Sequence, residues 1–119
     1  MLWHPLTDNA QLQNIIDISQ QQPENHRAVV IFKHSTRCSI SSMALSRFES
    51  KWADDPKVPA YYIDLLKFRD VSNETARLFG IEHQSPQVLV IKNGACIYTA
   101  SHNGIIVSEI LEAITTAAQ

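Results

Sequence analysis

The pattern of apolar and polar residues along the chain predicts an alternation of helices and strands. Two runs, residues 28–32 and 87–91, are almost continuously apolar, which is typical of strands covered on both faces. Residues 60–65 form a third apolar run, and residues 2–4 a weaker one. From helical spacing and capping signals we predict helices over four further segments: residues 8–21, 38–53, 72–79 and 107–117.

Short local signals mark the ends of several of these elements. Thr7 and Asp8 are typical of a helix start, because a side-chain oxygen can accept from the free amides of the first turn. Gly80 supplies the left-handed residue that ends many helices. Asn93-Gly94 is the strongest short hairpin signal, and it predicts that residues 95–100 form an antiparallel partner strand.

The helical spacing also predicts which side chains face the core. In the helix over residues 38–53, one face carries the apolar residues Ile40, Met43, Ala44, Phe48 and Trp52. In the last helix, the residues predicted to face the core are Ile110, Leu111 and Ile114.

The order of these elements predicts the fold class. Helices and strands alternate over the first two thirds of the chain, with a polar connection at residues 20–26, and a hairpin and a closing helix follow. This order predicts an α/β three-layer sandwich, a mixed central sheet flanked by helices. A length of 119 residues with 45% hydrophobic content predicts one domain over residues 1–119.

Composition and charge exclude several classes of partner. Ten Lys and Arg against twelve Asp and Glu give a net charge of -2, without basic blocks, so we expect no nucleic-acid partner. No segment approaches the roughly 20 apolar residues of a membrane helix, and we expect no membrane partner and a cytoplasmic location. Two cysteines without metal-like spacing are expected to be reduced thiols.

Cys38 is the candidate for chemistry, because it lies where the strand over residues 28–32 gives way to a helix. Only a thiolate is a good nucleophile, and unpaired helix amides together with nearby Lys33, His34 and Arg37 would favour the anion. The alternative is a cysteine that packs as a small apolar residue. Lys33 and His34 also have an ordinary alternative, as polar residues at the end of a strand.

The second thiol that a dithiol enzyme would need is absent from its usual place. Ser41 stands three residues after Cys38, and a hydroxyl cannot resolve a mixed disulfide. Cys96 lies in the predicted hairpin strand, where it is either a packed strand residue or a resolving partner for Cys38.

Residues 83–86 form a second segment of interest. A proline at a strand start, as in Ser85-Pro86, is ordinary by itself, and His83 precedes it in a loop that can neighbour Cys38. The other histidines show no ligand spacing, so we expect no metal site.

The sequence resembles the thioredoxin superfamily over nearly its whole length, in the order of its elements, the Cys-x-x-Ser at a helix start and the proline before a late strand. The resemblance implies that Pro86 is cis and lies against the reactive cysteine, and that the Ser85 backbone binds a thiol or peptide. Phe32 stands where dithiol thioredoxins carry a buried aspartate that helps to deprotonate the resolving thiol.

A closer resemblance is to the YtxJ-type monothiol bacilliredoxins, also called bacilliredoxin C. Their motif is Lys-His-Ser-Thr before Thr-Cys-Pro-Ile-Ser, and here Arg37 and Ser39 replace the usual Thr and Pro. The segments that carry the resemblance are His34-Ser35-Thr36-Arg37-Cys38-Ser39-Ile40-Ser41 and His83-Gln84-Ser85-Pro86-Gln87.

The family implies a thiol-disulfide oxidoreductase that removes bacillithiol from proteins carrying it as a mixed disulfide. Cys38 would be the nucleophile, no cofactor would be bound, and bacillithiol or a similar low-molecular-weight thiol would be the co-substrate. Because bacillithiol bears two carboxylates, a basic cradle is expected, with the candidates Lys33, His34, Arg37 and His83.

Two other classes remain open at this point. One is a thioredoxin-like binding module or redox sensor, in which Cys38 reacts without turnover. The other is an iron-sulfur carrier resembling monothiol glutaredoxins, although the Gly and Phe of their Cys-Gly-Phe-Ser motif are absent here.

Overall fold

A computed structural model describes residues 1–21 and 26–117. Most of the connection predicted over residues 20–26 lies outside these residues. The described elements, in chain order, are β1 (Trp3–Pro5), α1 (Ala10–Ser19), β2 (Val29–His34), α2 (Ser39–Lys51), β3 (Ala60–Asp64), α3 (Arg69–Phe79), β4 (Gln87–Lys92), β5 (Ala95–Ser101), the 3-10 turn η1 (His102–Gly104) and α4 (Val107–Ala117).

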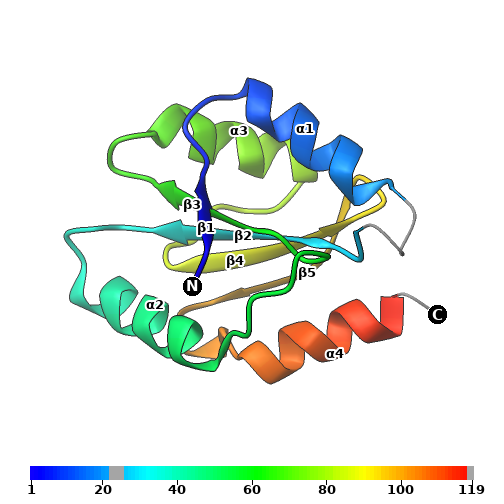
Figure 1. Ribbon diagram of the computed structural model, residues 1–119. Helices are drawn as coiled ribbons and strands as arrows, with labels where there is room; N and C mark the ends of the chain where they lie inside the picture. The colour runs from blue at the N-terminus through cyan, green and yellow to red at the C-terminus, as the bar shows by residue number, and fades with distance from the viewer. Residues whose placement is uncertain (22–25, 118–119) are drawn as a thin grey trace.

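The strands form one mixed sheet in the order β1-β3-β2-β4-β5. β3 pairs in parallel with both β1 and β2, whereas β4 pairs antiparallel with β2 and β5. Figure 1 shows α1 and α3 on one face of this sheet and α2 and α4 on the other. The predicted three-layer sandwich with a mixed central sheet is therefore confirmed.

β2 lies at the centre of the sheet and is buried along its whole length. Because side chains alternate along a strand, Val30 and Phe32 join the core under α2 and α4. Val29 and Ile31 join the separate core under α1 and α3. Burial on both faces explains why this run is apolar at every position.

The sheet also brings the candidate segments to one edge. β2 and β3 run in parallel, so their carboxyl ends, and the starts of α2 and α3 that follow them, lie at the same edge. At that edge Gln87, the first residue of β4, pairs with Lys33. Continuing this antiparallel register places Pro86 beside His34.

Several predicted element ends are confirmed, with one adjustment at the start of α1. Gly80 has φ 65° at the end of α3, and Asn93 and Gly94 both have positive φ in the hairpin turn. At the start of α1, Asp8 Oδ1 accepts from the Gln11 amide at 3.1 Å and Gln11 Oε1 accepts from the Asp8 amide at 3.1 Å. Asp8, not Thr7, therefore supplies the capping oxygen.

The predicted buried faces are wrong at three positions. Ile40 and Met43 are 58% and 63% exposed, and Leu111 is 46% exposed. The residues of α2 that face the core are Ser41, Ala44 and Phe48, at spacings of three and four. Ile40 and Met43 each precede one of these residues and so lie about 100° around the helix from it.

The start of α3 was also predicted wrongly, at residue 72. The helix begins at Arg69, after Phe68, and neither its first residue nor its N-cap carries a capping side chain. The start of a helix is recognised in a sequence by its capping side chain. Because α3 has none, its start could not be located in this way.

We predict that truncating α2 destabilises the fold only on its buried face. Phe48 is 1% exposed, and its ring centroid lies 5.4 Å from that of Phe32 and 5.2 Å from that of Trp52. Phe48→Ala is expected to lower the free energy of unfolding by about 3–5 kcal/mol in urea denaturation. Met43→Ala is the control on the same helix and is expected to change it by less than about 0.5 kcal/mol. A large loss from Met43→Ala would contradict this placement of the helix.

Candidate active site

Cys38 is the N-cap residue of α2 and is half-buried. Its backbone is extended, with φ -105° and ψ 120°, and its carbonyl accepts from the Ser42 amide at 3.0 Å. Its own amide donates to the Ser35 carbonyl at 3.1 Å, which closes the turn between β2 and the helix. Cys38 therefore lies at the N-terminus of α2, next to backbone amides that the helix itself leaves unpaired.

Ser41 is fully buried one turn into the helix and links two parts of the site. Its Oγ accepts from the Ser35 amide at 3.1 Å and lies 2.7 Å from His34 Nδ1. Burial lowers the pKa of His34, although Asp64, Glu49 and the contact with Ser41 oppose this effect. The Ser41 oxygen thus links the ring of His34 to the backbone of Ser35.

Lys33 points to the opposite face of the sheet and is also fully buried. Its Nζ donates to the Ser72 carbonyl at 3.1 Å and lies 3.2 Å from His83 Nδ1. Burial lowers the pKa of Lys33 to about 8. The ammonium group is therefore enclosed between α3 and the loop that carries His83.

His83 lies in the loop before β4 and contacts Ser72 of α3. Ser72 Oγ lies 3.3 Å from His83 Nδ1, the atom that Lys33 also approaches. Burial lowers the pKa of His83, and the positive charges of Lys33 and Arg69 lower it further. A neutral imidazole can accept from Lys33 through Nδ1.

Arg69 is a residue near the site that the sequence analysis did not select. It is exposed and begins α3, one turn before Ser72. Arg69 could have been found from its place shortly after the predicted strand over residues 60–65, because the residues that follow parallel strands lie at one edge of the sheet.

The Ser85–Pro86 peptide bond is cis, as the resemblance implied. Pro86 is buried, and its carbonyl accepts from the His102 amide at 3.1 Å. Among residues 1–21 and 26–117, Ser85 Oγ is the buried side-chain oxygen that has no hydrogen-bond partner. The loop before β4 thus brings a buried proline and an unsatisfied hydroxyl to the edge where β2 ends.

Arg37 immediately precedes Cys38, and among the candidate cations it is the exposed one. Lys33 and His34 are buried and bonded within the protein, and His83 is half-buried. The structure thus brings the candidates to one edge of the sheet, but Lys33 and His34 have little surface to offer a ligand.

Cys96 lies far from Cys38. The ladder aligns Cys96 with Ile91, and Ile91 with Val29 at the start of β2, whereas Cys38 follows the end of β2. A strand of six residues spans about 16 Å, well beyond the roughly 7 Å that a disulfide allows between Cα atoms. Burial raises the pKa of Cys96, whose sulfur lies 3.3 Å from the Tyr98 carbonyl. Cys96 is therefore a packed strand residue and does not resolve Cys38 in this fold.

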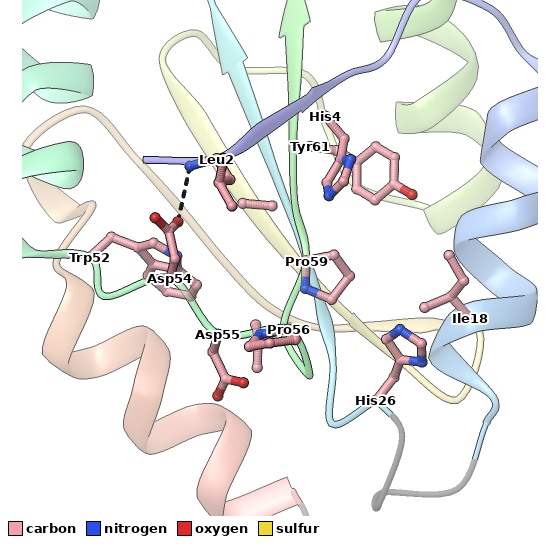
Figure 2. Close-up of a pocket in the computed structure, with 12 residues that line it drawn as sticks. Leu2, His4, Ile18, His26, Trp52, Asp54, Asp55, Pro56, Pro59 and Tyr61 are labelled. Atoms are coloured by element: carbon pink, nitrogen blue, oxygen red, sulfur yellow. Dashed lines mark hydrogen bonds between the residues drawn. The ribbon is translucent and has the colours of Figure 1, made fainter.

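A cavity of about 560 Å³ opens at the other end of the sheet. Figure 2 shows His4 beside Tyr61, with Pro59, His26 and Asp55 below them. The ring centroids of His4 and Tyr61 are 5.2 Å apart. Because the cavity is lined by the start of β3 and the segment that follows α2, it is separate from the Cys38 edge.

Two features are absent from the part of the chain that the structure describes. Within residues 1–21 and 26–117, no helix combines the length and apolarity needed to cross a bilayer. Nor do three His, Cys, Asp or Glu side chains gather there in an arrangement that could hold a metal ion.

The fold, together with the similarity to known proteins described next, identifies a thioredoxin-like thiol-disulfide oxidoreductase. A family model described as monothiol bacilliredoxin BrxC matches residues 4–110. The chain belongs to this family, which confirms the resemblance found in the sequence and supports a thiol redox role.

Solved structures agree with this assignment. A protein described as an oxidoreductase with a thioredoxin fold shares 28% identity at a TM-score of 0.76, over 93% of this chain and 92% of that chain. Thioredoxin Mala s 13 from Malassezia sympodialis shares 22% identity at a TM-score of 0.67, over 100% and 92%. Thioredoxin NaTrxh from Nicotiana alata shares 21% identity at a TM-score of 0.68, over 96% and 90%. The likeness to the two thioredoxins shows a shared fold.

We predict that the buried Lys33 makes stability depend on pH. Its pKa is about 8 in the folded chain, against an ordinary value of 10.5, so between these pH values the unfolded chain binds more protons. Stability conferred by Lys33 therefore rises with pH over this range, by on the order of 1–3 kcal/mol. The measurement is the free energy of unfolding of the wild type minus that of Lys33→Met at pH 7, 8, 9 and 10. Taking the difference removes the contributions of tyrosines and Cys96, and a difference that stays flat above pH 8 would contradict the burial of a charged lysine.

Proposed function

We propose that this protein removes a low-molecular-weight thiol, bacillithiol, from proteins that carry it as a mixed disulfide in the cytoplasm. The observation that carries the proposal is one half-buried thiol at a helix N-terminus, with a buried hydroxyl at the position of a resolving thiol. Membership of the monothiol bacilliredoxin family supports bacillithiol as the thiol.

The reaction has two exchange steps. The Cys38 thiolate attacks the bacillithiol sulfur, a Cys38–bacillithiol disulfide forms, and the protein thiolate leaves and takes a proton from water. A second bacillithiol thiolate then attacks this disulfide, which yields bacillithiol disulfide and regenerates the Cys38 thiolate. Because the second reducing thiol comes from solution, neither step needs Cys96 or a bound cofactor.

The recognition of bacillithiol rests on exposed positive charge. Its two carboxylates call for cationic donors, and Arg37 lies beside the nucleophile. Arg69 and His83 add positive and hydrogen-bonding groups from the start of α3 and the loop before β4. Lys33 and His34 are buried and offer little surface to the carboxylates.

We predict that turnover depends on Cys38 and not on Cys96. Cys38→Ser is expected to abolish release of thiol from a bacillithiolated protein in the presence of free bacillithiol, because serine is not a nucleophile for disulfides at neutral pH. Cys96→Ser is the matched control and is expected to retain the wild-type rate. Turnover by Cys38→Ser would refute the assignment, and a single stoichiometric release by the wild type would instead identify a redox sensor.

We predict that Arg37 selects for the charged thiol. Arg37→Ala is expected to reduce kcat/KM about fivefold to fiftyfold for a bacillithiolated peptide, through loss of a charge-assisted hydrogen bond. The same peptide carrying uncharged 2-mercaptoethanol should react at a nearly unchanged rate. Arg47→Ala, on an exposed turn further along α2, is the control. Equal losses with both peptides would show that Arg37 acts on the thiol and not on the carboxylates.

A further inference from the structure

The last two residues of β2 are polar and buried, and they point in opposite directions. Lys33 is 0% exposed and His34 5% exposed. Successive side chains on a strand face opposite sides of the sheet, so Lys33 faces the α3 layer and His34 the α2 layer. Each makes hydrogen bonds to a different segment of the site.

The His34 side holds the segment that carries Cys38. His34 Nδ1 lies 2.7 Å from Ser41 Oγ, and the same oxygen accepts from the Ser35 amide at 3.1 Å. The Cys38 amide in turn donates to the Ser35 carbonyl at 3.1 Å. Ser35 is therefore bonded both to the first turn of α2 and to the nucleophile's own backbone, which fixes the turn between them.

The Lys33 side holds the segment that leads to Pro86. Lys33 Nζ donates to the Ser72 carbonyl at 3.1 Å and lies 3.2 Å from His83 Nδ1. His83 is also within 3.3 Å of Ser72 Oγ. Burying an ammonium without a carboxylate partner is costly, and the Ser72 carbonyl and His83 Nδ1 are the two groups that offset this cost.

We propose that Lys33 and His34 are positioning residues that set the spacing between the two halves of the site: His34 fixes the Cys38 turn through Ser41, and Lys33 fixes the Pro86 loop through His83. This inference rests on the proposed function for its substrate, a protein mixed disulfide lying across both halves. It replaces the expectation that Lys33 and His34 bind the carboxylates of bacillithiol directly. A disulfide substrate has to contact both halves of the site, whereas a small alkylating reagent has to reach Cys38 alone. Loss of the Lys33 contacts should therefore slow thiol release only, and loss of the His34 contacts should slow both thiol release and Cys38 alkylation.

The first experiment compares Lys33→Met with Lys92→Met. Lys92 is a matched control, since it is 8% exposed and its Nζ donates to the Arg27 carbonyl at 2.9 Å, at the far end of the same sheet. Lys33→Met is expected to slow thiol release from a bacillithiolated peptide about tenfold to hundredfold, while the rate of Cys38 alkylation by iodoacetamide changes less than about twofold. Lys92→Met should leave both rates near the wild type. Equal release rates in the two variants, or a parallel loss of release and alkylation in Lys33→Met, would overturn the proposal.

A spectroscopic measurement tests the Lys33 side without any substrate. Nuclear magnetic resonance titration of the His83 ring is expected to show a higher pKa in Lys33→Met than in the wild type, because a neighbouring positive charge has been removed. An unchanged His83 titration would overturn the proposal. If the wild type releases no bacillithiol from any peptide, the proposed function fails, and this titration alone decides whether Lys33 holds His83.

The His34 side is tested by Ser41→Ala against Ser42→Ala, its exposed neighbour on α2. Losing the Ser41 hydroxyl frees the Ser35 amide, so both alkylation and thiol release are expected to fall several-fold. Ser42→Ala should change neither rate. Normal alkylation in Ser41→Ala, with circular dichroism confirming that the variant is folded, would remove the His34 side from the proposal.

Discussion

The burial of β2 between two apolar layers is the constraint on which the site depends. Four residues, Val29 to Phe32, are apolar because each must enter one core or the other. The strand continues for two more residues, Lys33 and His34, which remain buried although they are polar. Buried polar groups must find hydrogen-bond partners, and the partners available at this edge belong to α2, α3 and the loop before β4. Satisfying them assembles the surroundings of Cys38.

The same constraint accounts for the single-thiol chemistry. Phe32, where dithiol relatives carry a buried carboxylate, packs among Trp3 and Phe48, with ring centroids 5.9 Å and 5.4 Å away. Ser41 fills the place of a resolving thiol, and its oxygen is already engaged by His34 and Ser35. Cys96 is separated from Cys38 by the length of β2. These three features are consistent with the proposed second step, in which the reducing thiol comes from solution.

Much of the fold was predictable because its signals are local. The apolar runs predict buried strands, Gly80 predicts a helix end, and Asn93-Gly94 predicts a hairpin. The thioredoxin-like order of elements follows from these signals. The exposure of Ile40 and Met43 was not predictable, because the rotation of α2 is set by the buried Ser41, a polar residue that periodicity assigns to the surface. The hydrogen-bond partners of Lys33 and His34 were not predictable for a similar reason. Polarity shows that a side chain needs partners, but their identity depends on segments up to 50 residues away.

The most direct test of the account is to find which sulfur carries the intermediate. The wild-type protein would be mixed with one equivalent of a bacillithiolated peptide, quenched in acid, digested without reductant and examined by mass spectrometry. We expect bacillithiol in disulfide linkage on the peptide that contains Cys38, and a free Cys96. A Cys38–Cys96 disulfide, or bacillithiol attached to Cys96, would contradict it.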